Sequence, residues 1–167
     1  RYARGKYITY ANSDDRHRSD AFEVMVRELE SHQELALVYG DVWVTRCENQ
    51  KFGRHVRTGY HIRPEFSKEI MLTGCHMGPQ PMWRRAVHDH LGEFDGTLDS
   101  AADYEFWCRL AVHYPFKHIP QFLGLYYDNP HGVVNSNQQK SREQTDHIQK
   151  QYGKKFASSS KSFMNNY

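Results

Sequence analysis

The sequence predicts an α/β fold, because segments with strand character alternate with segments of helical periodicity. Residues 7–11 are β-branched, aromatic or small and carry no charge, which indicates a strand buried on at least one face. Residues 20–32 then carry an apolar stripe at helical spacing, with charged side chains outside it. A second apolar run, residues 35–39, ends at Gly40 and has the length of a strand.

The stretch up to residue 79 carries weaker signals. Residues 42–44 extend the second strand or form its neighbour. Residues 46–59 are polar and contain glycine, which indicates a loop or hairpin. A short helix is expected within residues 64–71, and glycines punctuate a loop over residues 73–79.

Stronger signals follow in the next fifty residues. Residues 82–84 have the composition of a short strand, and residues 85–91 that of a short helix ended by a glycine. The clearest helix of the chain opens at residues 100–103 and stops before the next proline. Residues 116–127 are apolar and aromatic and predict one extended segment, with Pro120 at a sheet edge.

The end of the chain is polar. Residues 128–132 predict a turn, a helix is expected over about 141–152, and the serine-rich residues 158–162 are typical of a linker or disordered tail. We therefore expect a domain portion, residues 1–135, followed by a polar, helical or disordered tail, residues 136–167.

Composition limits the possible function classes. The chain of 167 residues suits one domain or a large part of one. Its 22 basic and 20 acidic residues give a net charge of +2, which argues against a nucleic-acid-binding protein. No apolar run approaches the roughly 20 residues that span a membrane. Cys47, Cys75 and Cys108 are widely spaced and odd in number, which predicts free thiols in a reducing, cytoplasmic compartment. The chain starts with Arg1 rather than methionine, so we expect it to begin inside a longer protein.

The first strand delivers two adjacent carboxylates, Asp14 and Asp15, to its C-terminal end. Open α/β sheets often present metal or ligand sites there. Asn, Ser and Asp are also the ordinary residues of turns and helix caps, which is the simpler interpretation of this stretch alone. Two later residues favour the site, because Asp103 stands at a helix N-terminus and His131 follows the last apolar segment.

Several groups of residues occur in an order typical of one enzyme family. The matching stretches are residues 3–8 leading into 12–15, residues 83–85 followed by 92–95, and residues 103–111. They resemble the C-terminal two-thirds of the catalytic domain of family 2 inverting, metal-dependent nucleotide-sugar glycosyltransferases, over about residues 3–131. The resemblance implies a GT-A fold, which is a Rossmann-like mixed sheet flanked by helices. It also implies that the nucleotide-binding βαβ portion precedes Arg1.

The resemblance assigns the acidic turn to the donor. Asp15, together with Asp14, corresponds to the family's DxD-type motif, which holds Mn²⁺ or Mg²⁺ against the diphosphate of the leaving group. Asn12 stands where an aspartate is frequent, and its amide can still hydrogen-bond a ribose hydroxyl. The alternative for Asp14 remains a turn or a cap.

Asp103 corresponds to the family's catalytic base, which takes the proton of the acceptor hydroxyl. The pattern from Ser100 to Asp103 also resembles a capping box, and an acid in the first helical turn is favoured by the helix dipole. The two interpretations are compatible, because a helix N-terminus would keep Asp103 ionised. The family often has Glu immediately before this Asp, whereas this chain has Ala102.

Two further residues are candidates on weaker grounds. His131 loosely matches a histidine that many GT-A enzymes place near the metal and diphosphate, and an imidazole there could ligate the metal. A turn histidine without a role is the alternative. Gly74 lies in the loop where the family shapes the donor-sugar site, and glycine permits close backbone approach. An ordinary loop is the alternative.

The sequence therefore predicts transfer of a sugar from a nucleotide-diphosphate sugar, most often UDP-linked, to a hydroxyl on a carbohydrate, lipid or protein. Cell-surface polysaccharide biosynthesis is the expected context. The alternative is a truncated or degenerate module that binds sugar or nucleotide without catalysis. A glycoside hydrolase is disfavoured, because the adjacent Asp14 and Asp15 cannot straddle a sugar. In the transferase, Asp15 and Asp103 should face one cleft.

Overall fold

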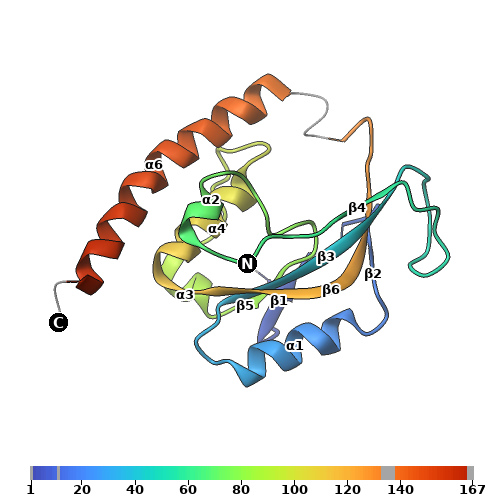
Figure 1. The fold of residues 1–167 in the computed structure, drawn as a ribbon, viewed down its shortest axis with the longest axis horizontal. Helices are drawn as coiled ribbons and strands as arrows, with labels where there is room; N and C mark the ends of the chain where they lie inside the picture. Colours follow the sequence, from blue (N-terminus) through green and yellow to red (C-terminus); the bar gives the residue numbers. More distant parts are fainter. Residues whose placement is uncertain (1, 11, 133–137, 165–167) are drawn as a thin grey trace.

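A computed structural model describes residues 2–10, 12–132 and 138–164. Its centre is a mixed sheet in the order β1-β5-β3-β6-β2, with β4 paired to β3 (Figure 1). The pair β3–β6 is parallel and the other pairs are antiparallel. The strands are β1 (Tyr7–Thr9), β2 (Arg16–His17), β3 (Leu37–Thr45), β4 (Gly59–His61), β5 (Met82–Arg84) and β6 (Phe116–Tyr127).

Helices cover both faces of the sheet (Figure 1). The helices are α1 (Ala21–Ser31), α2 (Lys68–Met71), α3 (Val87–Leu91), α4 (Ala102–His113) and α6 (Gln138–Met164). Alternation along β3 divides the core, since Leu37 and Tyr39 pack with α4 and α6 whereas Val38 packs with α1. The predicted α/β class is confirmed.

Aromatic side chains fill the larger core, as their number in the sequence suggests. Trp83 of β5 and Trp107 of α4 are almost fully buried, with ring centroids 5.0 Å apart at an interplanar angle of 70°. This edge-to-face arrangement is favoured by the ring quadrupoles. The packing fixes α4 against the sheet, and α4 carries Asp103 near its first residue.

The long strand β6 pairs with β3 along its length, whereas β2 pairs only with its Gly124 and Leu125. Pro120 is exposed and has no described strand on the side away from β3, so it lies at a local sheet edge, as predicted. The register shows how the pairing with β3 accepts a proline. Gly40 pairs with Ile119 and Asp41 with Phe122, so β6 has extra residues at the position of Pro120. A bulge leaves such a residue out of the ladder, and the missing N–H of proline costs no sheet hydrogen bond there.

The C-terminal helix is longer than predicted. It runs over Gln138–Met164 and takes in the serine-rich residues 158–162, which were expected to form a linker. Its apolar side chains Ile148, Tyr152 and Phe156 are buried in the same core as α4. The expected domain boundary at residue 135 falls outside the described residues, but the helix beyond it belongs to the core of the domain.

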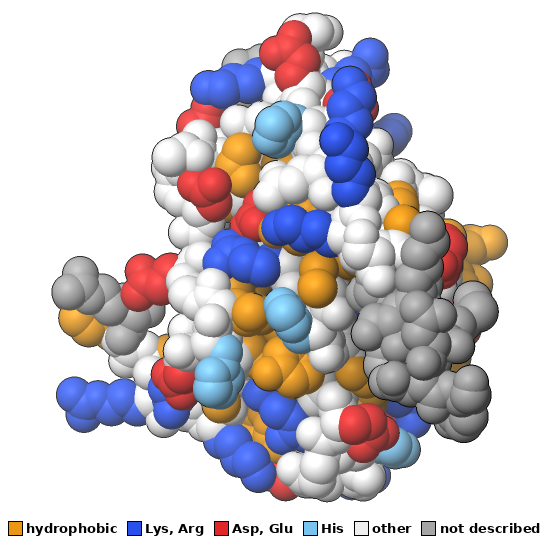
Figure 2. Space-filling view, turned by 90° about the vertical axis from the view of Figure 1, so that its left-hand side faces the viewer, with side chains coloured by type: hydrophobic (Ala, Val, Ile, Leu, Met, Phe, Trp, Pro, Cys, Tyr) orange, Lys and Arg blue, Asp and Glu red, His pale blue; other side chains and the backbone are white. Residues whose placement is uncertain are grey.

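Two further expectations concern the chain as a whole. Cys47, Cys75 and Cys108 are free thiols, as predicted. None of the helices in the described part of the chain is both long and apolar enough to cross a bilayer. Figure 2 shows Lys and Arg side chains lying among Asp, Glu and His side chains on one face of the molecule.

Candidate active site

The acidic turn lies between β1 and β2 and is fixed from both sides. Beyond the turn, β2 pairs with β6 through Arg16 opposite Leu125 and His17 opposite Gly124. The Arg16 guanidinium closes the turn by donating hydrogen bonds to the carbonyl oxygens of Ser13 and Asp15, at 3.0 and 2.6 Å. The pairing of β2 with β6 and the hydrogen bonds of Arg16 therefore hold the turn beside the C-terminal end of β6.

Asp15 is buried, with 7% of its surface exposed. Its Oδ1 accepts a hydrogen bond from the backbone N–H of Tyr127 at 3.0 Å, and its Oδ2 accepts one from Nδ2 of Asn12 at 2.9 Å. Burial raises the pKa of the Asp15 carboxyl, while these two hydrogen bonds oppose the rise. Asp15 thus links the turn to the end of β6.

Asp14 differs from its neighbour in environment. It is exposed, and no described residue donates a hydrogen bond to its carboxylate. Its charge contributes to the raised pKa values of Asp15 and Tyr126. Of the two adjacent carboxylates, Asp14 is the one whose oxygens are both available to a ligand.

Asp103 lies in the first turn of α4, as predicted, but the expected capping box does not form. The N-cap residue is Ala101, without a side-chain cap. Asp103 Oδ1 instead accepts a hydrogen bond from the N–H of Tyr104 at 2.7 Å, and the Ser100 hydroxyl donates to Gln144 Oε1 of α6 at 3.3 Å. The loop before α4 is therefore held by α6 rather than by its own cap.

The electrostatics of Asp103 also differ from expectation. Burial raises the pKa of this carboxyl, and the backbone N–H groups of Tyr104 and Asp103 oppose the rise without cancelling it. We expected the helix N-terminus to favour ionisation, but desolvation is the larger effect here. A carboxylate with a raised pKa is a stronger base than an ordinary surface aspartate.

Asn12 and Asp103 line one cavity of about 490 Å³. Its other lining residues are Tyr10, Gly78, Pro79, Phe94, Asp99, Ser100 and Ala102. Asp14 and Asp15 are not among the described residues that line it, and Asp15 is connected to this wall through its hydrogen bond to Asn12. The structure brings together the turn after β1 and the N-terminus of α4, which are far apart in sequence.

Gly74 and His131 lie elsewhere. The loop residue that lines this cavity is Gly78, with a left-handed φ of 72°, whereas Gly74 is not among the described lining residues. His131 is exposed in the turn after β6, and its backbone N–H donates to Asn129 Oδ1 at 2.9 Å. Across residues 2–10, 12–132 and 138–164, no three His, Cys, Asp or Glu side chains converge as a metal cluster.

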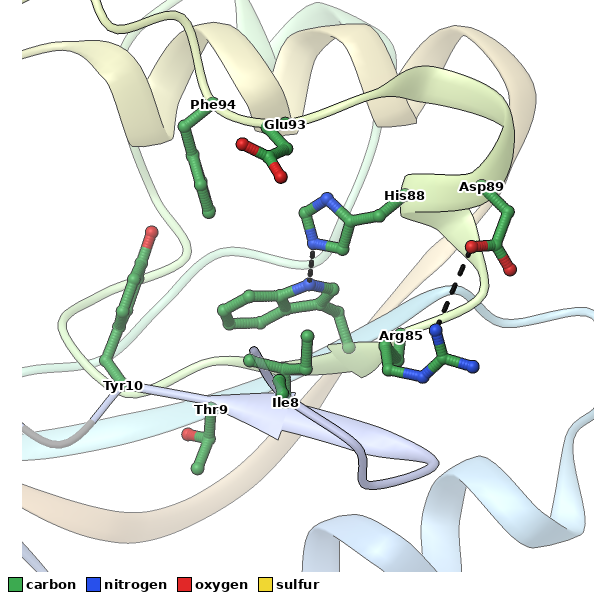
Figure 3. A pocket seen from close by; sticks show the side chains of 10 residues that line it. Ile8, Thr9, Tyr10, Arg85, His88, Asp89, Glu93 and Phe94 are labelled. Atoms are coloured by element: carbon green, nitrogen blue, oxygen red, sulfur yellow. Dashed lines mark hydrogen bonds and ion pairs between the residues drawn. The ribbon is translucent and has the colours of Figure 1, made fainter. Parts of the chain in front are cut away.

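A second cavity, of about 440 Å³, adjoins the first through Tyr10 and Phe94 (Figure 3). Ile8 and Tyr10 point into it, whereas Thr9 points to the other side of the strand, as strand alternation requires. His88 at its rim accepts a hydrogen bond from Trp83 Nε1 at 3.0 Å. This histidine therefore supports the core rather than a metal.

Sequence reasoning missed two features of the site. Gly78 belongs to the glycine loop that the sequence singled out, but nothing in the pattern distinguished it from Gly74. Gln144 of α6 accepts hydrogen bonds from both the N–H and the hydroxyl of Ser100, at 3.3 Å each. No sequence pattern marks Gln144, because its contact with Ser100 forms only when α6 packs against the domain.

Comparisons with known proteins show the family of this chain. The family described as "Glycosyl transferase family 2" matches residues 1–91. Chondroitin synthase of Pasteurella multocida (strain Pm70) is 32% identical over 119 residues, which is 71% of this chain and 12% of that protein. Chondroitin synthase of Escherichia coli is 29% identical over 119 residues, or 17% of its length. The chain thus spans less than a fifth of either relative.

Similar folds occur among solved structures. A crystal structure of S. aureus TarS, residues 1–349, matches with a TM-score of 0.56 at 16% identity, covering 97% of this chain and 49% of that one. At this identity the match concerns the fold alone, which is GT-A-like, with a mixed sheet between helices. The family 2 sequence model matches 91 of the 167 residues, which is more than half of the chain. The chain therefore belongs to glycosyl transferase family 2.

Proposed function

We propose that this chain transfers a sugar from a nucleotide-diphosphate sugar, UDP-linked, to an acceptor hydroxyl with inversion at the anomeric carbon. Family membership supports a sugar transfer. The observation that carries the specific proposal is the shared cavity, which Asp103 and Asn12 both line, with Asp15 hydrogen-bonded to Asn12. A base and a donor-binding turn on one cavity are what a direct displacement needs.

Asp103 is the general base of this proposal. Its carboxylate takes the proton of the acceptor hydroxyl while that oxygen bonds to the anomeric carbon. The bond from the anomeric carbon to the phosphate oxygen breaks, and the nucleoside diphosphate leaves with the bonding electron pair. The raised pKa of Asp103 supports the role, because a stronger base abstracts a hydroxyl proton more readily.

A divalent cation fits the residues of the turn. Mg²⁺ and Mn²⁺ are commonly held by one or two carboxylates together with substrate phosphates and water. Asp14 offers two available oxygens, and Asp15 keeps unused lone pairs beside its two hydrogen bonds. Asp14 and Asp15 are the proposed ligands of Mn²⁺ or Mg²⁺, without His131, which lies exposed in the turn after β6 and does not converge with them. The bound ion would neutralise charge on the leaving diphosphate.

The relatives guide the choice of acceptor. Two of them are chondroitin synthases by name, which favours a carbohydrate acceptor and a role in cell-surface polysaccharide biosynthesis over a lipid or protein acceptor. The three free thiols favour a reducing compartment, the cytoplasm. Both statements are part of the proposal.

Calorimetry with Mn²⁺ and a panel of nucleotide sugars tests the function, in parallel with a transfer assay. We expect metal-dependent binding of one donor and transfer to an acceptor. Asp103→Asn should keep donor binding and lose transfer. Donor binding without any transfer by the wild-type chain would support the alternative, a non-catalytic binding module, and normal transfer by Asp103→Asn would refute the base assignment.

A further inference from the structure

Arg63 stands behind the glycine loop of the cavity. Its backbone N–H donates to Asp41 Oδ1 at 2.9 Å, which fixes the chain just after β4. Its side chain is half-buried, and burial lowers the pKa of the guanidinium. The fold therefore holds this cation partly out of water, where its charge is unfavourable unless an anion compensates it.

No described residue compensates that charge directly. Within the described part of the chain, Arg63 forms no ion pair, and its Nε is buried without a hydrogen-bond partner. The nearby Asp41 is already engaged, because its Oδ1 contacts Nε2 of His118 at 2.7 Å as well as the Arg63 backbone. Buried donors in folded proteins are nearly always paired, so the unpaired Nε of Arg63 indicates a missing acceptor.

The guanidinium lies against the cavity wall at Gly78. A Cβ placed on Gly78 would be 3.3 Å from both Nε and Nη2 of Arg63. Gly78 itself lines the cavity that contains Asp103. The absence of a side chain at this position lets the loop backbone pass directly over the cation.

Two titratable groups, Tyr126 and Cys75, interact electrostatically with Arg63 and also with the carboxylates of the proposed site. Burial raises the pKa of Tyr126, Asp128, Asp15 and Asp14 add to the rise, and Arg63 opposes it. Burial of the thiol raises the pKa of Cys75, Asp103 adds to the rise, and Arg63 opposes it. Arg63 therefore lies within electrostatic reach of a neighbour of the acidic turn and of a neighbour of the catalytic carboxylate.

Building on the proposed function, we propose that Arg63 binds an anionic group of the donor, through its unpaired guanidinium behind Gly78. Two groups have this chemistry: a phosphate of the diphosphate, and the carboxylate of a uronic acid sugar. Arginine suits either, because its planar fork can give two parallel hydrogen bonds to phosphate or carboxylate.

Binding measurements on three variants test this inference. Arg63→Gln removes the charge, Arg63→Lys keeps the charge without the fork, and Arg54→Gln removes an exposed arginine from the loop before β4 as a matched control. Calorimetry in Mg²⁺ uses three probes: inorganic pyrophosphate, UDP-glucose and UDP-glucuronate. Thermal unfolding of each ligand-free variant checks its fold.

The probes separate the two sources of the anion. If Arg63 binds a phosphate, Arg63→Gln should weaken all three probes by about tenfold to a hundredfold. If it binds a uronate, only UDP-glucuronate should weaken. Arg63→Lys should fall between the wild type and Arg63→Gln, and Arg54→Gln should bind as the wild type does. Equal affinity of Arg63→Gln and wild type for all three probes would overturn the inference.

The same experiment separates this inference from the proposed function. If pyrophosphate binds the wild type and Arg63→Gln loses it, but neither nucleotide sugar binds, Arg63 is an anion site and the UDP-linked donor is wrong. If no probe binds the wild type, both are overturned. Removal of a half-buried cation that forms no described ion pair should also leave the ligand-free melting temperature equal or higher, and a clear decrease would mark Arg63 as structural.

Discussion

Asn12 and Asp15 are joined by a side-chain hydrogen bond of 2.9 Å, from Nδ2 to Oδ2. The other Asp15 oxygen accepts the N–H of Tyr127 at the end of β6. The residue at the cavity wall and the buried carboxylate behind it therefore form one unit. This unit links the turn after β1 to the last strand of the sheet, so the position of the cavity wall depends on Asp15.

Asp15→Ala should destabilise the domain as well as impair transfer. The alanine side chain accepts no hydrogen bond, so both Asn12 Nδ2 and the N–H of Tyr127 lose their acceptor. We expect a loss of about 1–3 kcal/mol in the free energy of unfolding, the cost of unsatisfied buried hydrogen-bonding groups. Urea unfolding followed by circular dichroism measures it.

Asp14→Ala is the matched control, because the two carboxylates are adjacent and only Asp14 is exposed. Its free energy of unfolding should stay within about 0.5 kcal/mol of the wild type. Metal-dependent donor binding should nevertheless fall. A stable Asp15→Ala protein would show that the two hydrogen bonds do not hold the turn, and unchanged donor binding by Asp14→Ala would remove Asp14 from the metal site.

The elements that could be predicted from sequence are those defined by local pattern. The strand after Pro115 and the helix that carries Asp103 follow from apolar periodicity and prolines, and both occur. The bulge at Pro120 could not be predicted, because it depends on a register shift between β3 and β6. Such a shift is a property of the pair of strands rather than of either sequence.

The candidate site could likewise be predicted only where local motifs define it. Asp103 at a helix start and the acidic turn are visible as local motifs, and the structure places Asp103 and Asn12 on one cavity. Which acidic residue is buried is not visible, since Asp15 acquires its partner Tyr127 only when β6 folds against the turn. The support of Ser100 by Gln144 likewise depends on the packing of α6.

Asp103→Asn should abolish transfer without lowering stability. The amide oxygen can still accept the N–H of Tyr104, so the local hydrogen bond remains. Because burial raises the pKa of Asp103 in the folded state, its favourable contribution is present below the unfolded pKa and lost as pH rises through the folded pKa. At neutral pH the substitution therefore removes a cost. We expect transfer to fall by about 10²- to 10⁴-fold, with an equal or higher melting temperature.

The pH dependence of transfer should reflect the same carboxyl. Asp103 acts as a base only when deprotonated, so kcat/KM should rise with pH through its pKa. Burial raises that pKa, and the acid limb should therefore lie above the ordinary aspartate value of about 3.9. A profile of kcat/KM against pH measures the limb, and a limb at or below the ordinary value would contradict the burial of the base.

Gly78→Ala should disturb the cavity more than it disturbs the fold. The left-handed φ of 72° costs a side chain about 1–2 kcal/mol, and the new Cβ would press on the Arg63 guanidinium at 3.3 Å. Gly53→Ala is the matched control, because Gly53 has a φ of 82° and nothing within 4 Å of the added carbon. Both variants should lose similar stability, and only Gly78→Ala should lose donor affinity in calorimetry. Equal donor affinity in the two variants would contradict a role for this loop position.

Tyr152→Phe tests whether the C-terminal helix is part of the domain. The Tyr152 hydroxyl donates to Glu105 Oε1 at 2.5 Å, and the same carboxylate is paired with Arg109 through Oε2 at 2.5 Å. Removing the hydroxyl leaves Oε1 with the weaker contact from Arg109 Nε at 3.2 Å. Because hydrogen bonds to charged groups contribute about 1.5–3 kcal/mol, we expect a loss of that size in the free energy of unfolding.

The control for this variant is Tyr60→Phe, which removes an exposed hydroxyl on β4 and should change stability by no more than about 0.5 kcal/mol. Chemical unfolding followed by tryptophan fluorescence reports on both, since Trp83 and Trp107 lie in the core that α6 covers. A helix that merely trails the domain would give equal stabilities for the two variants. A single transition that shifts to lower denaturant in Tyr152→Phe alone would place α6 in the cooperative unit that holds Asp103.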